Sequence, residues 1–207
     1  MAAPVRLLQL AAHQAELREC TRCPEMFGPP VLGACMLSDI LLVGQAPGDK
    51  EPKLGRPFAW TAGKNLFKWF ATLGVDEATF RAHVYIAAAC RCFPGKNPKG
   101  GDRVPDDGEI ARCRPWLERE VQLLAPRLIL PVGRLAIEQM LPAAPLVEQI
   151  GRLHSTVIGD KTFAVLPLPH PSGASTWYRT SPGDVLTRQA LDLLGEQPAW
   201  KRLRARV

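Results

Sequence analysis

The sequence lacks any apolar run that approaches the ~20 residues of a membrane-spanning helix. It has no internal repeat and no long low-complexity stretch either. The first twenty residues, MAAPVRLLQLAAHQAELREC, carry acidic residues within a helical period, which differs from the layout of a secretory signal. We therefore expect a cytoplasmic protein that does not insert into a membrane.

The sequence also has little local concentration of charge of one sign. The 207 residues carry a formal net charge of +6, but the excess is diffuse except at 201–206. A diffuse basic charge favours a polyanionic partner only weakly. With 46% hydrophobic residues the chain can bury one sizeable core. We expect a monomer that forms a single domain over 1–207 and ends in a short basic tail.

Six cysteines in a chain without an export signal favour metal or cluster ligation over disulfides. Cys20 and Cys23 form a Cys-x-x-Cys turn, and Cys92 and Cys113 can supply two more thiolates. Four thiolates suit either structural zinc or an iron–sulfur cluster, and the spacing leaves both open. In the alternative interpretation, Cys92 and Cys113 are small buried residues. Two further cysteines receive that interpretation here: Cys35 and Cys90.

Short apolar runs bounded by turn residues predict four buried strands, at 39–44, 84–89, 127–133 and 162–169. Amphipathic patterns predict helices at 3–19, 62–74, 106–125, 133–141 and 182–196. This alternation predicts an α/β protein of three αβα layers with a central, mainly parallel four-stranded sheet. Glycine, proline and charge at 93–108 predict a surface loop.

Unusual segments follow each predicted strand, where open α/β sheets bind their ligands. They are Gly44–Gly48, Cys90–Cys92, Gly133–Arg134 and Pro169–Gly173, and we expect the first, second and fourth to line one cleft. Within the last, His170 stands between two prolines that stiffen the backbone. We expect its imidazole to point into the cleft, and the alternative is a solvated or capping histidine.

Aromatic residues near these turns have two interpretations. Phe58 either stacks on a planar ligand or packs in the core. Trp177 and Tyr178, beside Arg179, suit contact with nucleic-acid bases and phosphates, or else pack against the closing helix. Three other tryptophans are predicted to pack in the core: Trp60, Trp69 and Trp116.

Taken in order, these motifs resemble the uracil-DNA glycosylase superfamily, and within it the iron–sulfur branch often called family 4. The resemblance covers roughly 13–195 and is carried by CTRCP, LLVGQAPGDKEPKLGRPFAWTAGKNL, VYIAAACRCFPG, DRVPDDGEIARCRPWL and PHPSG. It implies that four cysteines hold a [4Fe-4S] cluster outside the reaction centre, where it stabilises loops that grip DNA. The implied ligands are Cys20, Cys23, Cys92 and Cys113.

The resemblance also implies roles in extracting a base from DNA, which a glycosylase must flip into a pocket at a cost of about a few kcal/mol. Phe58 would stack on the base, backbone amides near Gln45 and Ala46 would bind it, and His170 would stabilise the departing base. Phosphates would be bound by four residues: Lys64, Ser172, Gly173 and Arg179. Segment 173–178 would wedge into the gap that the base leaves.

Two residues depart from the pattern of that family. Gln45 replaces an acid, and since an amide takes no proton from water at neutral pH, Asp49 is the alternative base. Ala88 replaces an asparagine that reads the uracil edge. Either Gln45 reads the base instead, or the pocket prefers another deaminated base such as hypoxanthine. A related branch traps the sugar with a loop histidine, but 93–108 contains none, so we expect no trapping there.

The sequence therefore predicts a monofunctional hydrolase that removes uracil from DNA, with DNA containing uracil or another deaminated base as its partner. Three alternatives stay open. They are a glycosylase for another damaged base, a catalytically silent iron–sulfur DNA-binding module, and a zinc-stabilised nucleotide-binding protein.

Overall fold

The computed structural model describes residues 2–173 and 175–206. Its five strands form one sheet in the order β2-β1-β3-β5-β4. Pairings β1–β2, β1–β3 and β3–β5 are parallel and β4–β5 is antiparallel, so the sheet is mainly parallel, as predicted. The bounds are β1 Ile40–Gly44, β2 Tyr85–Ala88, β3 Leu128–Pro131, β4 His154–Ile158 and β5 Lys161–Val165.

The sequence did not predict β4, which makes the sheet five-stranded instead of four-stranded. The residues of β4, HSTVI, are half-buried or exposed in alternation, because the strand lies at the edge of the sheet. By contrast, all five residues of β1 are buried. An edge strand with little buried apolar surface leaves a weak signal in the sequence.

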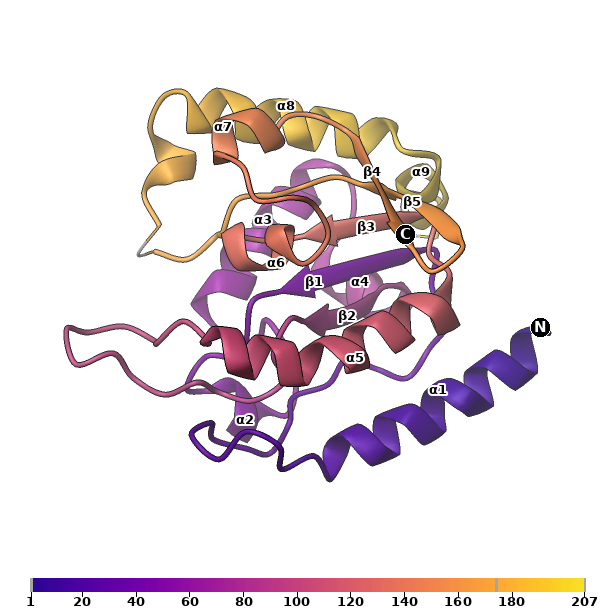
Figure 1. Cartoon of the computed structure of the whole chain (residues 1–207). Coiled ribbons are helices and arrows are strands. Elements are labelled where there is room, and N and C mark those ends of the chain that lie inside the picture. Colours follow the sequence, from indigo (N-terminus) through magenta and orange to yellow (C-terminus); the bar gives the residue numbers. More distant parts are fainter. Residues whose placement is uncertain (1, 174, 207) are drawn as a thin grey trace.

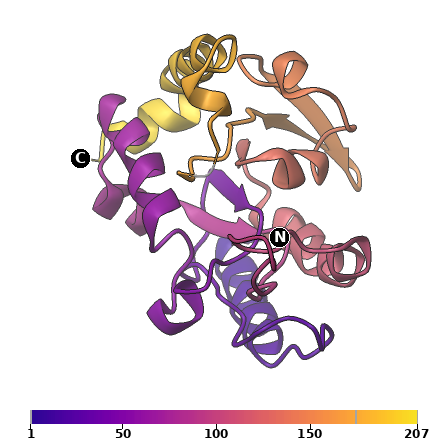
Figure 2. The ribbon, with the colours of Figure 1, turned by 90° about the vertical axis from the view of Figure 1, so that its left-hand side faces the viewer.

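Helices cover both faces of this sheet, which gives the predicted three layers; α3 and α9 lie on one side and α5 and α6 on the other (Figure 2). No helix of residues 2–173 and 175–206 is long and apolar enough to cross a membrane. The helices are α1 Ala3–Arg18, α2 Glu51–Leu54, α3 Thr61–Thr72, α4 Glu77–His83, α5 Asp107–Leu124, α6 Arg134–Glu138, α7 Leu146–Gln149, α8 Gly183–Glu196 and α9 Pro198–Arg204, with a 3-10 turn at Trp177–Arg179.

The carboxyl ends of β1 and β2 point toward the loop 93–108, which reaches out beyond the sheet, while both termini lie at the opposite end (Figure 1). The N-terminus of α5 fixes where that loop rejoins the fold. Asp106 accepts a hydrogen bond from the Glu109 amide at 2.8 Å, and Glu109 accepts one from the Asp106 amide at 2.9 Å. This reciprocal cap satisfies two amides that a helix start otherwise leaves free.

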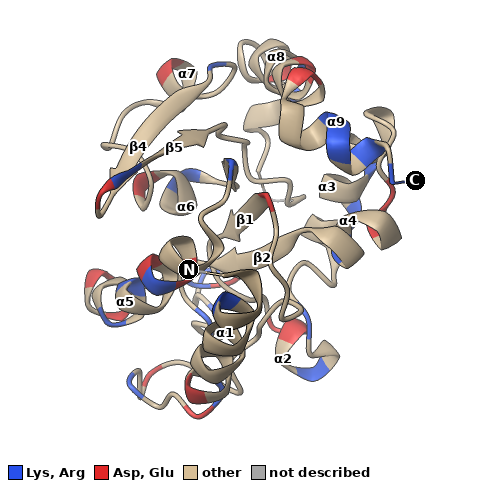
Figure 3. Ribbon diagram, turned by 90° about the vertical axis from the view of Figure 1, so that its right-hand side faces the viewer, with Lys and Arg blue, Asp and Glu red and all other residues tan. Residues whose placement is uncertain are grey.

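The C-terminal segment differs from the expected basic tail. Most of it forms α9, whose Lys and Arg residues lie near the C-terminus (Figure 3) and are exposed. Its other face carries Trp200, which is 0% exposed. The indole contacts Phe70 with ring centroids 5.1 Å apart, and Phe70 stacks on Phe80 at 4.7 Å. Burying such a ring adds substantially to the core, so this segment belongs to the folded body.

Helix α3 lies close to the chain just before it because of Gly63. A Cβ atom at this position would lie 1.8 Å from the Phe58 carbonyl oxygen, a separation that no side chain tolerates. Gly195 in α8 is a helical glycine in an open setting, where a Cβ would meet only Leu73 Cδ2 at 3.6 Å. The close approach at Gly63 sets the position of Phe58 relative to the sheet.

Gly63→Ala should therefore lower the free energy of unfolding by about 2 kcal/mol or more, since the methyl group forces the backbone of Phe58 to move. Gly195→Ala is the matched control and should raise stability by about 0.5–1 kcal/mol through its better helix propensity. Urea unfolding followed by circular dichroism measures both. Equal effects of the two substitutions would contradict the close packing at Gly63.

Candidate functional site

A cavity of about 560 Å³ opens at the carboxyl ends of β1 and β2. Its walls come from segments far apart in the sequence: the turn 44–51, the segment 57–62, the loop 94–103, and His170 with Ser172. Ala88, at the end of β2, also lines it. The turn after β1 and the segment after β5 thus meet, as expected. Cys90–Cys92 does not reach this cavity, and Arg134 lines a neighbouring one together with Gln45.

Phe58 lies inside this cavity and is 9% exposed. Its φ of 53° is rare for a bulky residue, and hydrogen bonds hold it there. Arg81 donates to the carbonyl oxygens of Pro57 and Phe58 at 2.9 and 2.8 Å. Gly44 is needed below the ring, because a Cβ there would lie 2.9 Å from two Phe58 ring atoms. The ring is therefore a fixed wall at the end of β1.

Glu51 joins that wall to the turn after β1. Its carboxylate accepts hydrogen bonds from the Ala59 amide at 2.9 Å and from the Gly48 amide at 3.3 Å. The side chain is buried, and burial raises its pKa above the usual value of a glutamate. Because both oxygens are engaged with backbone amides, Glu51 fixes the shape of the cavity.

His170, in the segment that follows β5, also lines the cavity. The Ser172 amide donates to His170 Nδ1 at 3.3 Å, which assigns Nδ1 as an acceptor and places the proton of a neutral ring on Nε2. Burial lowers the pKa of His170 below its ordinary value, so the neutral form is favoured at physiological pH. Asn65 of α3 donates to the Pro171 carbonyl at 2.9 Å and ties this segment to α3.

Gln45 and Asp49 both line the cavity and are half-buried. Lys96 Nζ lies 3.3 Å from Asp49 Oδ2 and 2.6 Å from Asp102 Oδ1, and Lys50 Nζ lies 3.4 Å from Asp49 Oδ2. Slight burial raises the pKa of Asp49, but the hydrogen bonds and charges of Lys96 and Lys50 outweigh it and lower that pKa overall. Asp49 is thus a firmly ionised carboxylate at the cavity.

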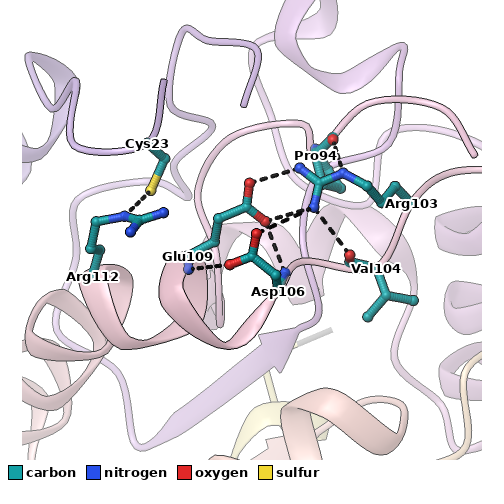
Figure 4. Close-up of polar contacts among 7 residues, drawn as sticks. All are labelled: Cys23, Pro94, Arg103, Val104, Asp106, Glu109 and Arg112. Atoms are coloured by element: carbon teal, nitrogen blue, oxygen red, sulfur yellow. Dashed lines mark hydrogen bonds and ion pairs between the residues drawn. The ribbon is translucent and has the colours of Figure 1, made fainter. Parts of the chain in front are cut away.

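The loop carrying Lys96 is anchored to α5 (Figure 4). Arg103 donates to both carboxylate oxygens of Glu109, at 2.8 and 2.7 Å, and to the Pro94 carbonyl at 2.7 Å. Glu109 is 0% exposed, and a buried carboxylate is stable only when paired and hydrogen-bonded in this way. The loop is exposed over most of 96–108, as predicted, and this anchoring also makes part of it a wall of the cavity.

The residues expected to contact DNA are more dispersed. Lys64 is exposed on α3, Ser172 lines the cavity, and Gly173 has open space around it. Arg179 Nε and Nη2 donate to the Tyr178 hydroxyl at 2.9 and 2.7 Å. Trp177 packs against α8, where a Cβ on Gly183 would lie 2.0 Å from the Trp177 carbonyl oxygen. Of the proposed wedge 173–178, Ala174 lies outside the described residues.

Cysteines line a second cavity of about 370 Å³, between the end of α1 and the middle of α5. Cys90 is buried in contact with Cys113 and Met26, as expected of a small apolar residue. Cys35, in contrast, is exposed, so its interpretation as a buried residue is wrong. The four cysteines that line the second cavity are those named from the sequence: Cys20, Cys23, Cys92 and Cys113.

The chemistry of this second cavity suits a thiolate-bound group. Arg112 Nε lies 3.5 Å from Cys23 Sγ and lowers the pKa of that thiol, but burial outweighs this effect and raises the pKa of Cys23 overall. Burial also raises the pKa of Cys92, and the buried guanidinium of Arg91 is paired with Glu120. Among residues 2–173 and 175–206, no three Cys, His, Asp or Glu side chains form a ready-made coordination set. The four thiols therefore fit a cluster by donor type and by the room between them, without a preformed geometry.

Three cavity residues escaped the sequence-based site prediction. Glu51 and Lys96 gave no signal, because a carboxylate within a turn and a lysine within a charged loop are ordinary features. Trp60 was wrongly expected in the core: it is 51% exposed at the cavity. Trp60 directly precedes α3, and Lys64 lies four residues later, about one helical turn away. A charged residue one turn away could have indicated that this side of the helix start is exposed.

A three-layer α/β sheet with an aromatic cavity at its carboxyl edge and a cysteine-lined cavity beside it defines a class of ligand-binding α/β proteins. Within that class, residues 31–194 match the family described as "Uracil DNA glycosylase superfamily". The match covers most of the chain and the segments of the first cavity, but it begins after Cys20 and Cys23 of the second. This chain belongs to that superfamily.

Curated relatives carry type-4 and type-5 names. The chain is 30% identical to the "Type-4 uracil-DNA glycosylase" of Sulfurisphaera tokodaii over 66% of this chain and 61% of that protein. It is 31% identical to the type-4 protein of Pyrobaculum aerophilum, over 70% and 67% of the two chains. The "Type-5 uracil-DNA glycosylase" of Thermus thermophilus is 34% identical over 49% of each. The first of these alignments spans less than two thirds of the relative's length.

The low pKa of His170 makes stability depend on pH. The unfolded chain protonates this histidine near pH 6.5, whereas the folded protein holds it neutral to a lower pH. The unfolded state therefore binds more protons below about pH 6.5, and the contribution of His170 to stability is lost as the pH falls. We expect the unfolding free energy of the wild type to fall relative to that of His170→Gln between about pH 7.5 and 5.

Urea unfolding of both proteins at each pH measures this difference. Taking the difference removes the shared contribution of His13, whose pKa burial also lowers. A difference that stays constant over the pH range would mean that His170 is solvated and not held in the cavity.

Proposed function

We propose that this chain is a monofunctional, monomeric DNA glycosylase that hydrolyses the N-glycosidic bond of uracil in DNA and starts base-excision repair. The observation that carries the proposal is His170, which lines the same cavity as Phe58 with its Nδ1 engaged by the Ser172 amide. That contact leaves Nε2–H of a neutral ring as a donor. The superfamily match and the names of the type-4 relatives support uracil as the base.

The cavity can hold a base only after the base leaves the duplex. Flipping costs about a few kcal/mol, which stacking and hydrogen bonds inside a pocket offset. In this proposal the base lies against the fixed ring of Phe58, and backbone amides of Gln45 and Ala46 bind its polar edge. Because Arg81, Glu51 and Gly63 already fix that wall, little order has to be gained when the base enters.

Cleavage sends the electron pair of the bond between the sugar C1′ and the base nitrogen to the base. Negative charge then develops on a base carbonyl oxygen and positive charge on the sugar. His170 Nε2–H donates to that oxygen, and one prepositioned donor of this kind contributes about 3 kcal/mol. A neutral imidazole suffices for this, because the step needs a hydrogen-bond donor in a dry site and no full proton transfer.

Water then adds to C1′ and loses a proton. Gln45 can orient the water through its amide oxygen, and Asp49 supplies the carboxylate near it. The neighbouring lysines lower the pKa of Asp49, which makes it a weak base, but water bound to a sugar cation is acidic enough for a weak base. Asp49 therefore acts chiefly by orienting the water and stabilising the cation.

Lys50 and Lys96 are the two lysines that line the cavity, and the contacts of Lys96 argue against its acting as a lyase nucleophile. Its hydrogen bond to Asp102, with Asp49 as a second partner, raises the pKa of Lys96. A protonated amine has no lone pair with which to attack the sugar. Hydrolysis by water is the reaction that these residues favour.

Base identity is the open part of the proposal. Ala88 lines the cavity where an amide would read uracil, and a methyl group offers no donor or acceptor. Gln45 is the amide that remains at the cavity, and it can pair with the N–H and C=O of uracil or of hypoxanthine. Ala88 therefore favours, as a second candidate, a glycosylase for another deaminated base such as hypoxanthine.

A panel of oligonucleotides, each with one uracil, hypoxanthine or xanthine, tests the activity when abasic products are cleaved by alkali. We expect uracil release by the wild type, and His170→Ala should lower the rate constant about 10²- to 10³-fold by removing one donor. Gln45→Glu and Ala88→Asn should shift the preference among the three bases.

His154→Ala is the matched control, since His154 lies on edge strand β4 outside the cavity, where its Nε2 contacts the Gln149 carbonyl at 2.8 Å. Its rate should equal that of the wild type. No strand breaks on any base would refute the enzyme and leave the silent DNA-binding module. If His170→Ala releases the base at the wild-type rate, the role of His170 is refuted but the glycosylase activity is not.

The cysteine-lined cavity supports a second part of the proposal, a [4Fe-4S] cluster held by Cys20, Cys23, Cys92 and Cys113. Such a cluster, when bound, cross-links segments through four thiolates. Here it would join the Cys-x-x-Cys turn after α1 to the β2 loop and to α5. DNA would be gripped by the loops that these elements support. Burial raises the pKa of Cys23 and Cys92, so a bound metal would itself have to displace the thiol protons.

Anaerobically purified protein should be brown with absorbance in the blue region, and it should contain about four iron atoms per chain if the cluster is [4Fe-4S]. Cys92→Ser should lose the colour and most of the iron. Cys35→Ser, at an exposed cysteine outside the cavity, is the control and should keep both. Zinc without iron in the wild type, measured by elemental analysis, would contradict the cluster.

A further inference from the structure

Trp60 is placed unusually for so large an apolar side chain. It is 51% exposed and lies at the rim of the 560 Å³ cavity, two residues after Phe58, which lines the interior. Single exposed apolar residues need no explanation, but this one borders a cavity built around another aromatic ring. Its location is therefore the first reason to look for a ligand.

The backbone of Trp60 is firmly held although its ring is not. The Trp60 carbonyl accepts the hydrogen bond of the Lys64 amide at 3.1 Å, at the start of α3. Close packing of Gly63 on the Phe58 carbonyl fixes the same turn. Among the described residues the indole has no aromatic neighbour within stacking distance, unlike Trp69 and Trp200. A rigid backbone thus presents a mostly uncovered ring to solvent.

Lys64 completes the arrangement. Its Nζ lies 5.3 Å from the centroid of the Trp60 ring, within the ~6 Å range of a cation–π contact. Lys64 is exposed and makes no ion pair within the described part of the chain. A ring with a cation beside it, next to a cavity, offers both a stacking surface and a charge for a phosphate.

We propose that Trp60 and Lys64 form a second nucleobase site, at which the indole stacks on the base next to the flipped nucleotide and Lys64 binds the adjoining phosphate. The inference rests on the proposed function. Two residues of chain span at most about 7 Å, and nucleotides along a strand are spaced by about 3.4 Å. The ring thus lies within reach of a nucleotide adjacent to one held at Phe58.

A stacking platform of this kind recognises any base, since every base has a π-face. The rim site therefore adds affinity without reading sequence, and it also acts on single strands. The site gives this chain a grip on the strand that is independent of the base in the cavity. Its removal should weaken DNA binding by the same factor whether the cavity holds uracil, hypoxanthine or no base.

The test uses the full chain and single-stranded oligonucleotides with a tetrahydrofuran abasic analogue and 2-aminopurine on its 5′ or 3′ side. Wild type should quench the 2-aminopurine on one side. Trp60→Ala should abolish the quenching and weaken binding about 5- to 150-fold, the loss of one stacked base. Trp60→Phe should restore most of both. Circular dichroism and urea midpoints confirm that each variant folds.

The salt dependence of DNA binding distinguishes the contribution of Lys64 from that of Trp60. Lys64→Met should reduce the slope of log affinity against log salt by about 1, because one phosphate contact is lost. Trp60→Ala should weaken binding at every salt concentration with an unchanged slope. Leu54→Ala, 49% exposed but outside the cavity, is the control and should match the wild type in both measurements.

Binding by Trp60→Ala that equals the wild type, with no change in 2-aminopurine fluorescence on either side, would overturn the inference even if uracil is released. The two proposals fail separately. If the wild type releases no base but Trp60→Ala still binds DNA more weakly than the wild type, the proposed function is refuted and the rim site stands.

Discussion

The backbone of Phe58 is the constraint on which the cavity depends. A bulky residue at a φ of 53° carries a strain of order ~1–3 kcal/mol and persists only where its surroundings hold it. Arg81 binds its carbonyl oxygen, and Gly63 packs against that carbonyl from α3. In this conformation the ring lies directly against Gly44 at the end of β1. Relaxation of the backbone would move the ring and remove one wall of the cavity.

Much of this arrangement could be predicted from the sequence, and the exceptions have physical reasons. Buried strands such as β1 are recognisable in the sequence as apolar runs. These runs therefore predicted the parallel strands and the edge of the sheet at which they end. The edge strand β4 buries too little to give that signal. The C-terminal segment was expected to be a tail because its lysines and arginines obscure the residues that bury α9 in the core, which are Ala199, Trp200 and Leu203.

The residues of the first cavity also fall into those that the sequence pattern predicts and those that it does not. Gln45, Ala88 and His170 lie at or after strand ends, and parallel strands end at one edge, so topology brings them to one cavity. Phe58 lies between α2 and α3 and is held at the same cavity by its contacts with Arg81 and Gly63. Lys96 arrives there only because Arg103 pairs with buried Glu109 and anchors the loop. Pairings between distant charges leave no periodic pattern in a sequence. For that reason the sequence predicted the exposed loop but not its second role as a wall of the cavity.

Helix α5 links the two cavities through side chains one turn apart. Glu109 anchors the loop of the first cavity, and Cys113, at position i+4 on the same face, lines the second. Whatever the cysteines hold would therefore stiffen the helix on which the loop depends. The connection needs no contact between such a group and the base, because a rigid helix transmits the constraint.

In the proposed function, the groups that would promote cleavage differ from those that would select the base. Cleavage needs a donor toward the leaving base, and His170 has one whatever the base is. Choice needs an amide at the base edge, and here Ala88 supplies none. Stacking on Phe58 and Trp60, as proposed, would add affinity for every base, since all bases have π-faces. In such a site selectivity rests on the one amide left, Gln45, and on the cost of flipping, which is lowest for mismatched or damaged bases.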